Sequence, residues 1–270
     1  MAQVLPENSK DVESFKGRFG WYAFTRYPIL YITRTVNGEH FKFVSMRIAE
    51  THLLDSYLHY FHPEVYTCTS VKSYYMTNSE AKLLNNINTK YCKNVYGHYD
   101  FTANKDCIVH LEDVLELYKF LKACYNKISP TIDNNEIEFG YIRINSFFVP
   151  YFTKDNKKYL PLFYFEGQTQ HLLTRTVELK NWDLVYLKFC FKVMGIYEEL
   201  YDGESCSVVS LNDIKTHYPP ETSFEDFWPS NLQKKCHLIN QRKSRNQPGV
   251  WATLHYEAVL PPENTQKNKI

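Results

Sequence analysis

The spacing of apolar residues predicts a hairpin and two helices in the first part of the chain. Runs rich in β-branched and aromatic residues at 27–35 and 40–45 flank Asn37-Gly38, a dipeptide typical of tight hairpin turns. Apolar residues at helical spacing predict a helix over 47–60. The helix-start residues at 77–80 precede a further amphipathic stretch, so a second helix is expected there.

The elements predicted for the rest of the chain follow an order similar to that of the first part. The interval 64–72 is β-branched and is predicted to be a strand. Residues 129–135 break the periodicity and form the candidate linker. The other elements expected from the pattern are strands at 107–109, 139–152, 159–164 and 208–209, helices at 113–125, 170–174 and 182–194, and a helical turn at 213–217.

Short sequence similarities suggest that these two regions are related. Tyr31-Ile32-Thr33 precedes the first hairpin turn as Tyr151-Phe152-Thr153 precedes the second, and His52-Leu53-Leu54 corresponds to His171-Leu172-Leu173. We therefore expect an α+β protein built from two tandem mixed α/β modules. The expected organisation is a flexible N-terminus over 1–18, a first module over 19–130, a second module over 136–220, and a C-terminal extension with helix and strand over 221–270.

Composition and charge exclude several classes of protein. Hydrophobic residues make up 44% of the 270 residues and aromatic residues 16%, which suits a chain with a substantial core. The formal net charge of +1 provides no global field that would draw the protein to nucleic acid or membrane. There is no apolar run of membrane-spanning length, and the seven cysteines are irregularly spaced. We expect a soluble intracellular protein with free thiols and no membrane partner.

The second region contains a recognisable series of motifs. Lys192-Val193-Met194-Gly195-Ile196 is followed by an acidic loop, by Ser205-Cys206, by Val208-Val209 and by Asp213. This series is similar to the closing part of the Ski/Sno/Dachshund homology domain. Tyr159-Leu160-Pro161-Leu162 resembles the family's Cys-Leu-Pro segment, with the cysteine absent. Gly195 follows the last periodic residue of the helix, so we expect it to adopt a positive φ there.

The first region resembles the same family at fewer positions. Val36-Asn37-Gly38-Glu39 resembles the hairpin turn of the Dachshund branch, and Glu64-Val65-Tyr66-Thr67 resembles the strand that follows it. Cys107-Ile108-Val109 is matched to the position of Cys206. This region lacks the Leu-Pro pair, and its loop before Cys107 is longer.

The resemblance implies a winged-helix-like fold for each module and a function in gene regulation. Members of the family bind partner proteins, chiefly co-repressors and transcription factors, and the Dachshund branch has been linked to DNA. The resemblance brings no catalytic residues and no cofactor. We therefore expect a non-enzymatic protein-interaction adaptor of co-repressor type in the nucleus, with nuclear proteins as partners. A DNA-binding transcription regulator is the alternative.

Two groups of residues are candidate binding sites. An acidic loop and a nearby aromatic pair are the candidates for partner binding: Glu198, Glu199, Asp202, Glu204, Phe227 and Trp228. The favoured alternative for the aromatic pair is a strap that pins the C-terminal segment to the second module. A basic run is the candidate for nucleic-acid binding or for nuclear import, with a solvated face as the simpler alternative: Lys234, Lys235, Arg242, Lys243 and Arg245.

Catalytic and metal chemistry have little support in the sequence. None of the phosphate-cradling, zinc-protease or nucleophile-elbow motifs occurs. Cys92, His98, Cys107 and His110 carry zinc-ligand side chains, but their spacing differs from the compact zinc-knuckle patterns. Core thiols and loop histidines explain these four residues equally well, and we expect no bound metal.

Overall fold

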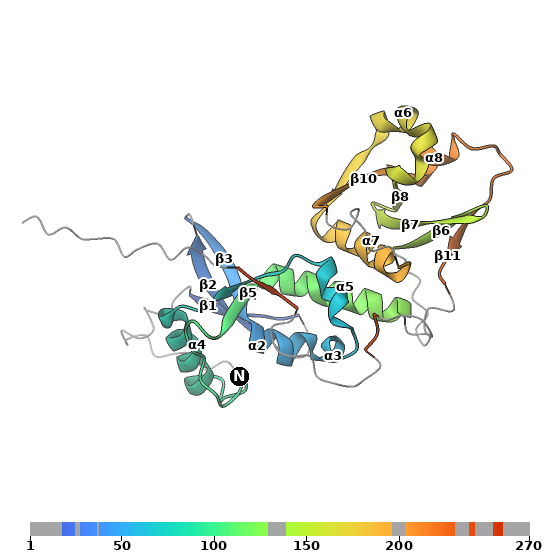
Figure 1. Cartoon of the computed structure of the whole chain (residues 1–270). Helices are drawn as coiled ribbons and strands as arrows, with labels where there is room; N and C mark the ends of the chain where they lie inside the picture. Colours follow the sequence, from blue (N-terminus) through green and yellow to red (C-terminus); the bar gives the residue numbers. More distant parts are fainter. Residues whose placement is uncertain are drawn as a thin grey trace, which may run out of the picture. The chain divides into compact units, whose positions relative to one another are not determined.

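The computed structural model describes residues 18–24, 28–36, 38–128, 139–195, 203–229, 238–240 and 251–255. It has a mixed α+β fold with two sheets and several helices, which confirms the expected fold class at this level (Figure 1). Packing divides the described residues into two compact units, the first within 1–49, 72–111 and 252–270 and the second within 50–71 and 112–251. These units are defined by packing, whereas the expected modules are defined by repetition, so the module boundaries stay predictions.

The sheet of the first unit has the strand order β1-β2-β3-β5-β4-β12. All neighbouring pairs are antiparallel except β4 and β12, which are parallel. The hairpin formed by β2 and β3 turns at Gly38, where the sequence predicts a tight turn. The φ of Gly38 is 85°. The strands are β1 (Phe19–Tyr22), β2 (Ile29–Val36), β3 (Glu39–Ser45), β4 (Lys72–Tyr75), β5 (Cys107–His110) and β12 (Thr253–Leu254).

Helix α4 (Asn78–Lys90) follows β4 and begins with a capping box between Thr77 and Glu80. Its buried face carries Ala81, Leu84 and Ile87, at the spacing expected for one side of a helix. The other helix of this unit is α2 (Met46–Ala49), which continues directly from β3. The expected helix over 47–60 is therefore present, although it includes a π-helical segment, η1 (Glu50–Leu54), before α3 (Asp55–Leu58).

The sheet of the second unit has the order β11-β6-β7-β8-β10-β9, with every neighbouring pair antiparallel. The expected strand 139–152 is a hairpin with a turn at Asn145, whose φ is 50°. The strands are β6 (Phe139–Ile144), β7 (Phe147–Lys154), β8 (Lys157–Pro161), β9 (Val177–Lys180), β10 (Ser205–Ser210) and β11 (Phe224–Phe227).

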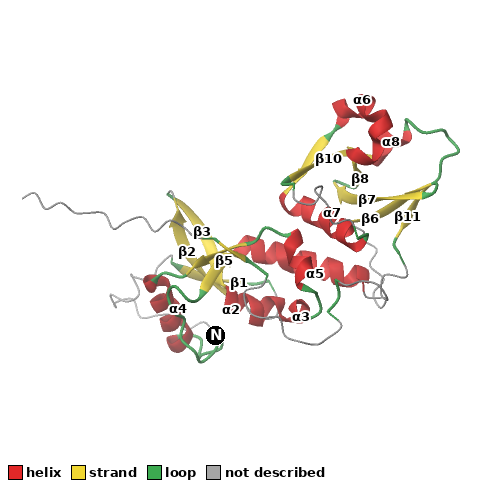
Figure 2. Ribbon diagram, viewed as in Figure 1, coloured by secondary structure: helices red, strands yellow, loops and turns green. Residues whose placement is uncertain are grey.

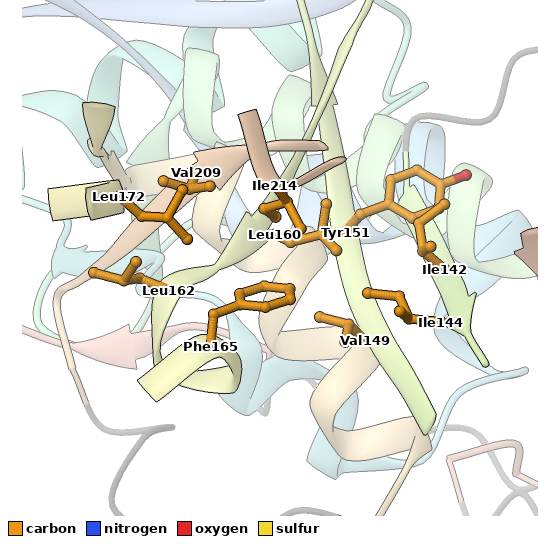
Figure 3. Packing of buried hydrophobic residues seen from close by; sticks show 10 residues of the cluster. All are labelled: Ile142, Ile144, Val149, Tyr151, Leu160, Leu162, Phe165, Leu172, Val209 and Ile214. Carbon is orange, nitrogen blue, oxygen red and sulfur yellow. The ribbon is translucent and has the colours of Figure 1, made fainter. Parts of the chain in front are cut away.

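Each face of this sheet packs against its own layer of apolar side chains. On one face, Phe139 and Phe152 contact Tyr186 of helix α7 (Asn181–Val193), and Phe120 of helix α5 (Leu111–Ile128) joins them. The opposite face carries the cluster in Figure 3, in which strand residues meet side chains from short helices. Those helices are η3 (Leu162–Gln168), α6 (Thr169–Leu172) and α8 (Leu211–Lys215). The short helix η4 (Leu173–Arg175) follows α6 and has no buried side chain.

Four strands have the same order in the two sheets, whose strands are yellow in Figure 2. The antiparallel series β2-β3-β5-β4 in the first matches β7-β8-β10-β9 in the second, and β1 and β6 occupy the same place beside it. The chain also connects these strands in the same sequence, with a helix after β4 and β9 and another after β5 and β10. This shared topology supports the expectation of two related modules.

A side-chain arrangement is repeated at the same register. Gly20 of β1 pairs with Tyr31 of β2, and Lys42 Nζ lies 5.1 Å from the Tyr31 ring centroid. In the second sheet Gly140 pairs with Tyr151, and Lys158 Nζ lies 4.7 Å from that ring. Both lysines pair with the threonine two residues after the tyrosine. We call this arrangement the Gly–Tyr–Lys triad.

Two details of the sequence interpretation are wrong. The interval 64–72, expected to be a strand, is mostly the 3-10 helix η2 (Pro63–Cys68), because Pro63 starts a helical turn that His62 caps. Within this interval Lys72 alone lies in a strand, as the first residue of β4. Cys107 does not match Cys206 in register. Val109 pairs with Val44 of β3, and Val209 pairs in the same way with Leu160 of β8. Val109 therefore corresponds to Val209, and Cys107, two residues earlier in its strand, corresponds to Ser207. A shift of one residue places a side chain on the opposite face of a sheet.

The prediction for Gly195 is confirmed. Helix α7 ends at Val193, Met194 forms its C-cap, and Gly195 follows with a φ of 77°. The Gly195 amide donates to the Lys192 carbonyl over 3.0 Å, which satisfies one of the carbonyls left free at the helix end. Only glycine adopts this backbone conformation without steric strain.

Replacing Gly195 with valine is expected to lower the free energy of unfolding by about 1 kcal/mol or more, because a β-branched residue is strained at positive φ. Urea unfolding monitored by circular dichroism measures the change. Gly167→Val is the matched control, since a Cβ at Gly167 has no neighbour within 4 Å and its φ is not in the left-handed region. An unchanged midpoint for Gly195→Val would show that the glycine is not needed for capping.

The C-terminal extension contributes a strand to each sheet. β11 pairs with β6, so Phe224 lies opposite Ile144 and Phe227 opposite Tyr141. β12 pairs with β4 at the far end of the first sheet. Between them, Ile239 forms an isolated antiparallel bridge with Phe61. The described part of the extension thus contains the strands β11 and β12, and Ile239 lies in extended backbone at its bridge.

Candidate partner-binding site

The structure describes only part of the predicted site residues. All five basic residues, Lys234, Lys235, Arg242, Lys243 and Arg245, lie outside the described residues, and so do Glu198, Glu199 and Asp202. Glu204 is exposed directly before β10. Phe227 and Trp228 are described and half-buried at the end of β11. The candidate site that can be built from contacts is therefore the one around β11.

β11 holds its aromatic side chains against the neighbouring strands. The Phe227 ring stacks on Phe148 with a centroid separation of 4.3 Å and an interplanar angle of 29°. Trp228 lies 5.4 Å from the Tyr141 ring and 6.1 Å from Phe139. β11 is thus a strap, as one of the two sequence interpretations holds, and its rings remain partly accessible. We call Phe148, Phe227 and Trp228 the β11 aromatic face.

A half-buried lysine borders this face. Lys127 Nζ, from the last turn of α5, lies 5.5 Å from the Trp228 ring and 5.6 Å from the Phe139 ring. Burial lowers the pKa of Lys127, because an ammonium ion loses hydration there. Aromatic faces attract a cation electrostatically and replace part of that hydration. No sequence pattern singles out Lys127, since a lysine in a last helical turn is usually solvated.

Charged side chains of β11 lie on both faces of the sheet: Glu225 shares the face of Phe227, whereas Asp226, opposite Ile142, lies on the other face. Glu225 forms an ion pair with Arg143, which lies opposite it on β6. Asp226 accepts a hydrogen bond from Lys158 Nζ over 2.6 Å, and this lysine covers the Tyr151 ring. Burial and the nearby Asp226 carboxylate raise the pKa of Tyr151 well above its ordinary value. Its hydroxyl therefore remains protonated at neutral pH and is unsuited to act as a base.

The arrangement is suited to recognition of a protein surface. Trp, Tyr and Phe side chains supply large contact areas at little cost in conformational entropy, and they dominate the binding energy of many interfaces. Ion pairs at the edge add orientation more than affinity. The β11 aromatic face has both components within one strand and its neighbours.

No family model, curated protein or solved structure matches this chain in the comparisons. Within the part of the chain that the structure describes, every helix is too short or too polar to cross a membrane.

The four zinc-ligand candidates do not gather in the described structure. No group of three or more His, Cys, Asp or Glu side chains among the described residues is placed to hold a metal ion. His110 packs instead between rings of the first sheet, 4.3 Å from Phe43 and 5.5 Å from Phe41. Burial raises the pKa of the Cys92 thiol and of the Cys107 thiol, which disfavours the thiolate that zinc requires.

Proposed function

We propose that this protein is a non-enzymatic interaction adaptor in nuclear transcriptional regulation, of co-repressor type, built from two related Ski/Sno/Dachshund-like modules. The observation that carries the proposal is the β11 aromatic face with Lys127 at its border, because half-exposed aromatic rings beside charged groups are typical of protein interfaces. The shared strand order and the Gly–Tyr–Lys triad support the two-module organisation. The confirmed backbone conformation of Gly195 supports the motif on which the resemblance rests.

A tethering assay tests this function. The full chain is fused to a heterologous DNA-binding domain, and we expect it to repress a reporter gene that carries the matching sites. Trp228→Ala combined with Phe227→Ala should relieve most of that repression, because both rings contribute contact area. Leu173→Ala is the matched control, since this side chain is 53% exposed and lies outside the face. Full repression by the double variant, at equal protein level, would exclude the β11 aromatic face as the interface.

DNA binding by the basic segment 234–245 is the alternative function, and one observation favours it. The described middle of this segment is fixed to the second unit, because the His62 amide donates to the Leu238 carbonyl and the Asn240 amide donates to the Tyr60 carbonyl, both over 2.8 Å. Leu238 is fully buried. In the sequence, the five basic residues lie on both sides of this anchored stretch.

Duplex DNA binding should depend steeply on salt if this alternative holds. Five neutralised phosphates imply a slope of roughly −4 to −5 in a log–log plot of affinity against salt, and each cation removed should reduce it by about one. Fluorescence anisotropy with a labelled duplex measures the slope. For an adaptor we expect weak binding at physiological salt. Sub-micromolar affinity that is lost when the five residues are replaced would instead establish the DNA-binding function.

A further inference from the structure

The two Gly–Tyr–Lys triads differ at one position of the described structure. In the second sheet, Asp226 of β11 accepts a hydrogen bond from Lys158 Nζ over 2.6 Å, and the Tyr151 hydroxyl also hydrogen-bonds to this carboxylate. The aspartate comes from the strand that lies beyond the glycine strand β6. In the first sheet the glycine strand is β1, which is the last described strand on that side. The position of the carboxylate is therefore open among the described residues.

The Tyr31 side chain reaches from β2 over β1, toward the open side of the sheet. A Cβ at Gly20 would lie 2.5 Å from the Tyr31 hydroxyl oxygen, so the end of the ring rests on the glycine. Tyr151 lies over Gly140 in the same way, and from there its hydroxyl reaches Asp226. Gly20 thus leaves room for a tyrosine hydroxyl that can donate to a group beyond β1.

Lys42 supplies the positive charge of the first triad. It is exposed, and it has no ion pair among the described residues. Glu39 is the acid of the strands β1 to β3, and it is three positions from Lys42, which places it on the other face of the sheet. A carboxylate added beyond β1 would therefore meet an ammonium ion and a hydroxyl donor, with no acid of these strands on that face. Such charge-assisted hydrogen bonds are the strong ones.

The other face of the same edge exposes an aromatic ring. Trp21 corresponds to Tyr141, because each follows the glycine of its triad. Tyr141 is 1% exposed, and Trp228 lies 5.4 Å from its ring, whereas Trp21 is 46% exposed. The Trp21 indole donates to Tyr96, so its ring is the part available for contact. β11 and the residue after it thus cover, on both faces of β6, the groups that β1 leaves accessible.

The backbone of β1 is arranged to pair with a further strand. The Thr33 amide donates to the Arg18 carbonyl over 2.8 Å, so alternate residues from Arg18 onward bond to β2. Trp21 consequently directs its N–H and C=O away from β2. In the second sheet the Asn145 amide donates to the Ser223 carbonyl, so the same alternation directs the odd-numbered residues of β6 to β11. Strand edges of this kind bind extended peptides.

We propose that the outer edge of β1 binds an extended peptide segment of a partner protein, in which an aspartate is followed by an aromatic residue, in the way that β6 binds β11. The peptide lies antiparallel to β1, with its aspartate opposite Tyr22 and its aromatic residue opposite Trp21. The carboxylate reaches Lys42 and the Tyr31 hydroxyl, and the aromatic ring covers Trp21 on the other face. The backbone pairing selects a peptide over a nucleic-acid strand, which has no amide groups in its backbone.

Peptide binding to the full chain tests the inference. The probe is a fluorescein-labelled peptide with the sequence of residues 222–229, and its binding is followed by fluorescence anisotropy. We expect saturable binding that weakens on the order of tenfold with Asp226→Asn in the peptide, because the charged hydrogen bond to Lys42 is lost. Lys42→Ala in the chain should weaken binding of the unchanged peptide to a similar degree. The two changes together should cost little more than either one alone, because they remove the same contact.

A methyl group on the peptide backbone tests the strand pairing. N-methylation of the peptide at Phe227, which lies opposite Trp21, removes the amide hydrogen directed at β1 and should abolish measurable binding. N-methylation at Asp226 is the matched control, because this amide points away from β1, and the peptide should keep most of its affinity. The chain itself is the same in both measurements, so a folding defect cannot account for a difference.

Two protein variants complete the controls. Lys42→Ala should keep the thermal midpoint of the native chain, since the side chain is exposed. Lys119→Ala removes an equal charge from the second unit and should leave peptide binding unchanged. The inference is overturned if the asparagine peptide binds equally well, if Lys42→Ala binds like the native chain, or if both N-methylations have the same effect. Failure of the full chain to bind the peptide also overturns it, and sedimentation then shows whether a second copy covers β1.

This inference goes beyond the proposed function, because the edge of β1 shares no residue with the β11 aromatic face. The chain with Phe227→Ala and Trp228→Ala should bind the labelled peptide normally, whether or not it still represses a reporter. Exchange of the peptide with β11 at β6 is distinguished as well. Such exchange would not respond to Lys42→Ala, which is a change in the first sheet.

Discussion

Replacing Glu80 with alanine is expected to destabilise the first unit by about 3–5 kcal/mol, the range found when one partner of a buried ion pair is removed. Arg34 Nε donates to Glu80 Oε1 over 2.8 Å, and its Nη2 donates to Oε2 over 2.9 Å. Both side chains are almost buried, with 12% and 13% exposed. The variant leaves the Arg34 guanidinium desolvated without its carboxylate, and it also removes one half of the α4 capping box.

Urea unfolding of three variants separates the pair from other effects. Arg34→Met combined with Glu80→Leu should be more stable than Glu80→Ala alone, because it leaves no charge unpaired. Lys119→Ala breaks an exposed ion pair with Glu116 and should cost less than about 1 kcal/mol. If Glu80→Ala costs no more than Lys119→Ala, the buried pair does not contribute to stability in the way its geometry indicates.

The ion pair between Arg34 and Glu80 makes the free energy of unfolding depend on pH in the acidic range. Burial by itself raises the pKa of Glu80, but hydrogen bonds from Arg34 and from Thr77 outweigh it, and the pKa lies below its ordinary 4.5. Because the folded-state pKa is the lower one, the stabilisation is complete above the unfolded value and is lost as the pH falls through the folded value. The stability difference between the native chain and Glu80→Gln should therefore shrink below about pH 4.5.

The second large effect is expected at Tyr151, the buried tyrosine of the Gly–Tyr–Lys triads. Tyr151→Ala should cost about 3–5 kcal/mol, because its side chain is 1% exposed and packs in the core of the second unit. Tyr31→Ala should cost clearly less, since Tyr31 is only half-buried. Urea unfolding of both variants measures the difference, and equal losses would contradict the burial argument.

Gly140 provides a stringent check of the same packing. A methyl group at this position would lie 3.2 Å from the Tyr151 ring, closer than ordinary van der Waals contact. Gly140→Ala should therefore destabilise the native chain, and it should cost less when combined with Tyr151→Leu, which removes the ring. The coupling free energy from this double-mutant cycle isolates the steric contact. Additive effects would show that the glycine is not required by the tyrosine.

The sequence predicted those elements whose boundaries depend on local chemistry. The start of α4 at the helix-start residues 77–80, the hairpin at Gly38 and the end of α7 at Gly195 were predicted because each depends on a few adjacent residues. The strands β1 and β9 were not predicted. Both strands are short: β1 lies beside its four-strand series, and β9 is the last strand of its own. Pairing with β2 and with β10 therefore determines their extended conformation more than their own hydrophobic pattern does.

The candidate sites depend on contacts that a sequence does not display. Phe227 and Trp228 could be singled out as a cluster, but their neighbours Phe148 and Lys127 come from distant segments. The conformation of the connection between α4 and β5 depends on Asn85 and Asn88, whose side-chain amides bond to its backbone groups. A helical spacing of asparagines beside a long loop is the signal that could have revealed it.

The pairing of β12 with β4 has a consequence for synthesis on the ribosome. Lys72 is made long before its partner Thr253. Until Thr253 is made, the edge of the first sheet lacks this strand, and exposed edges of sheets can pair with other chains. A nascent chain that stalls after the second sheet would therefore retain this open edge. Chaperone dependence should then fall as soon as residues 253 and 254 leave the exit tunnel.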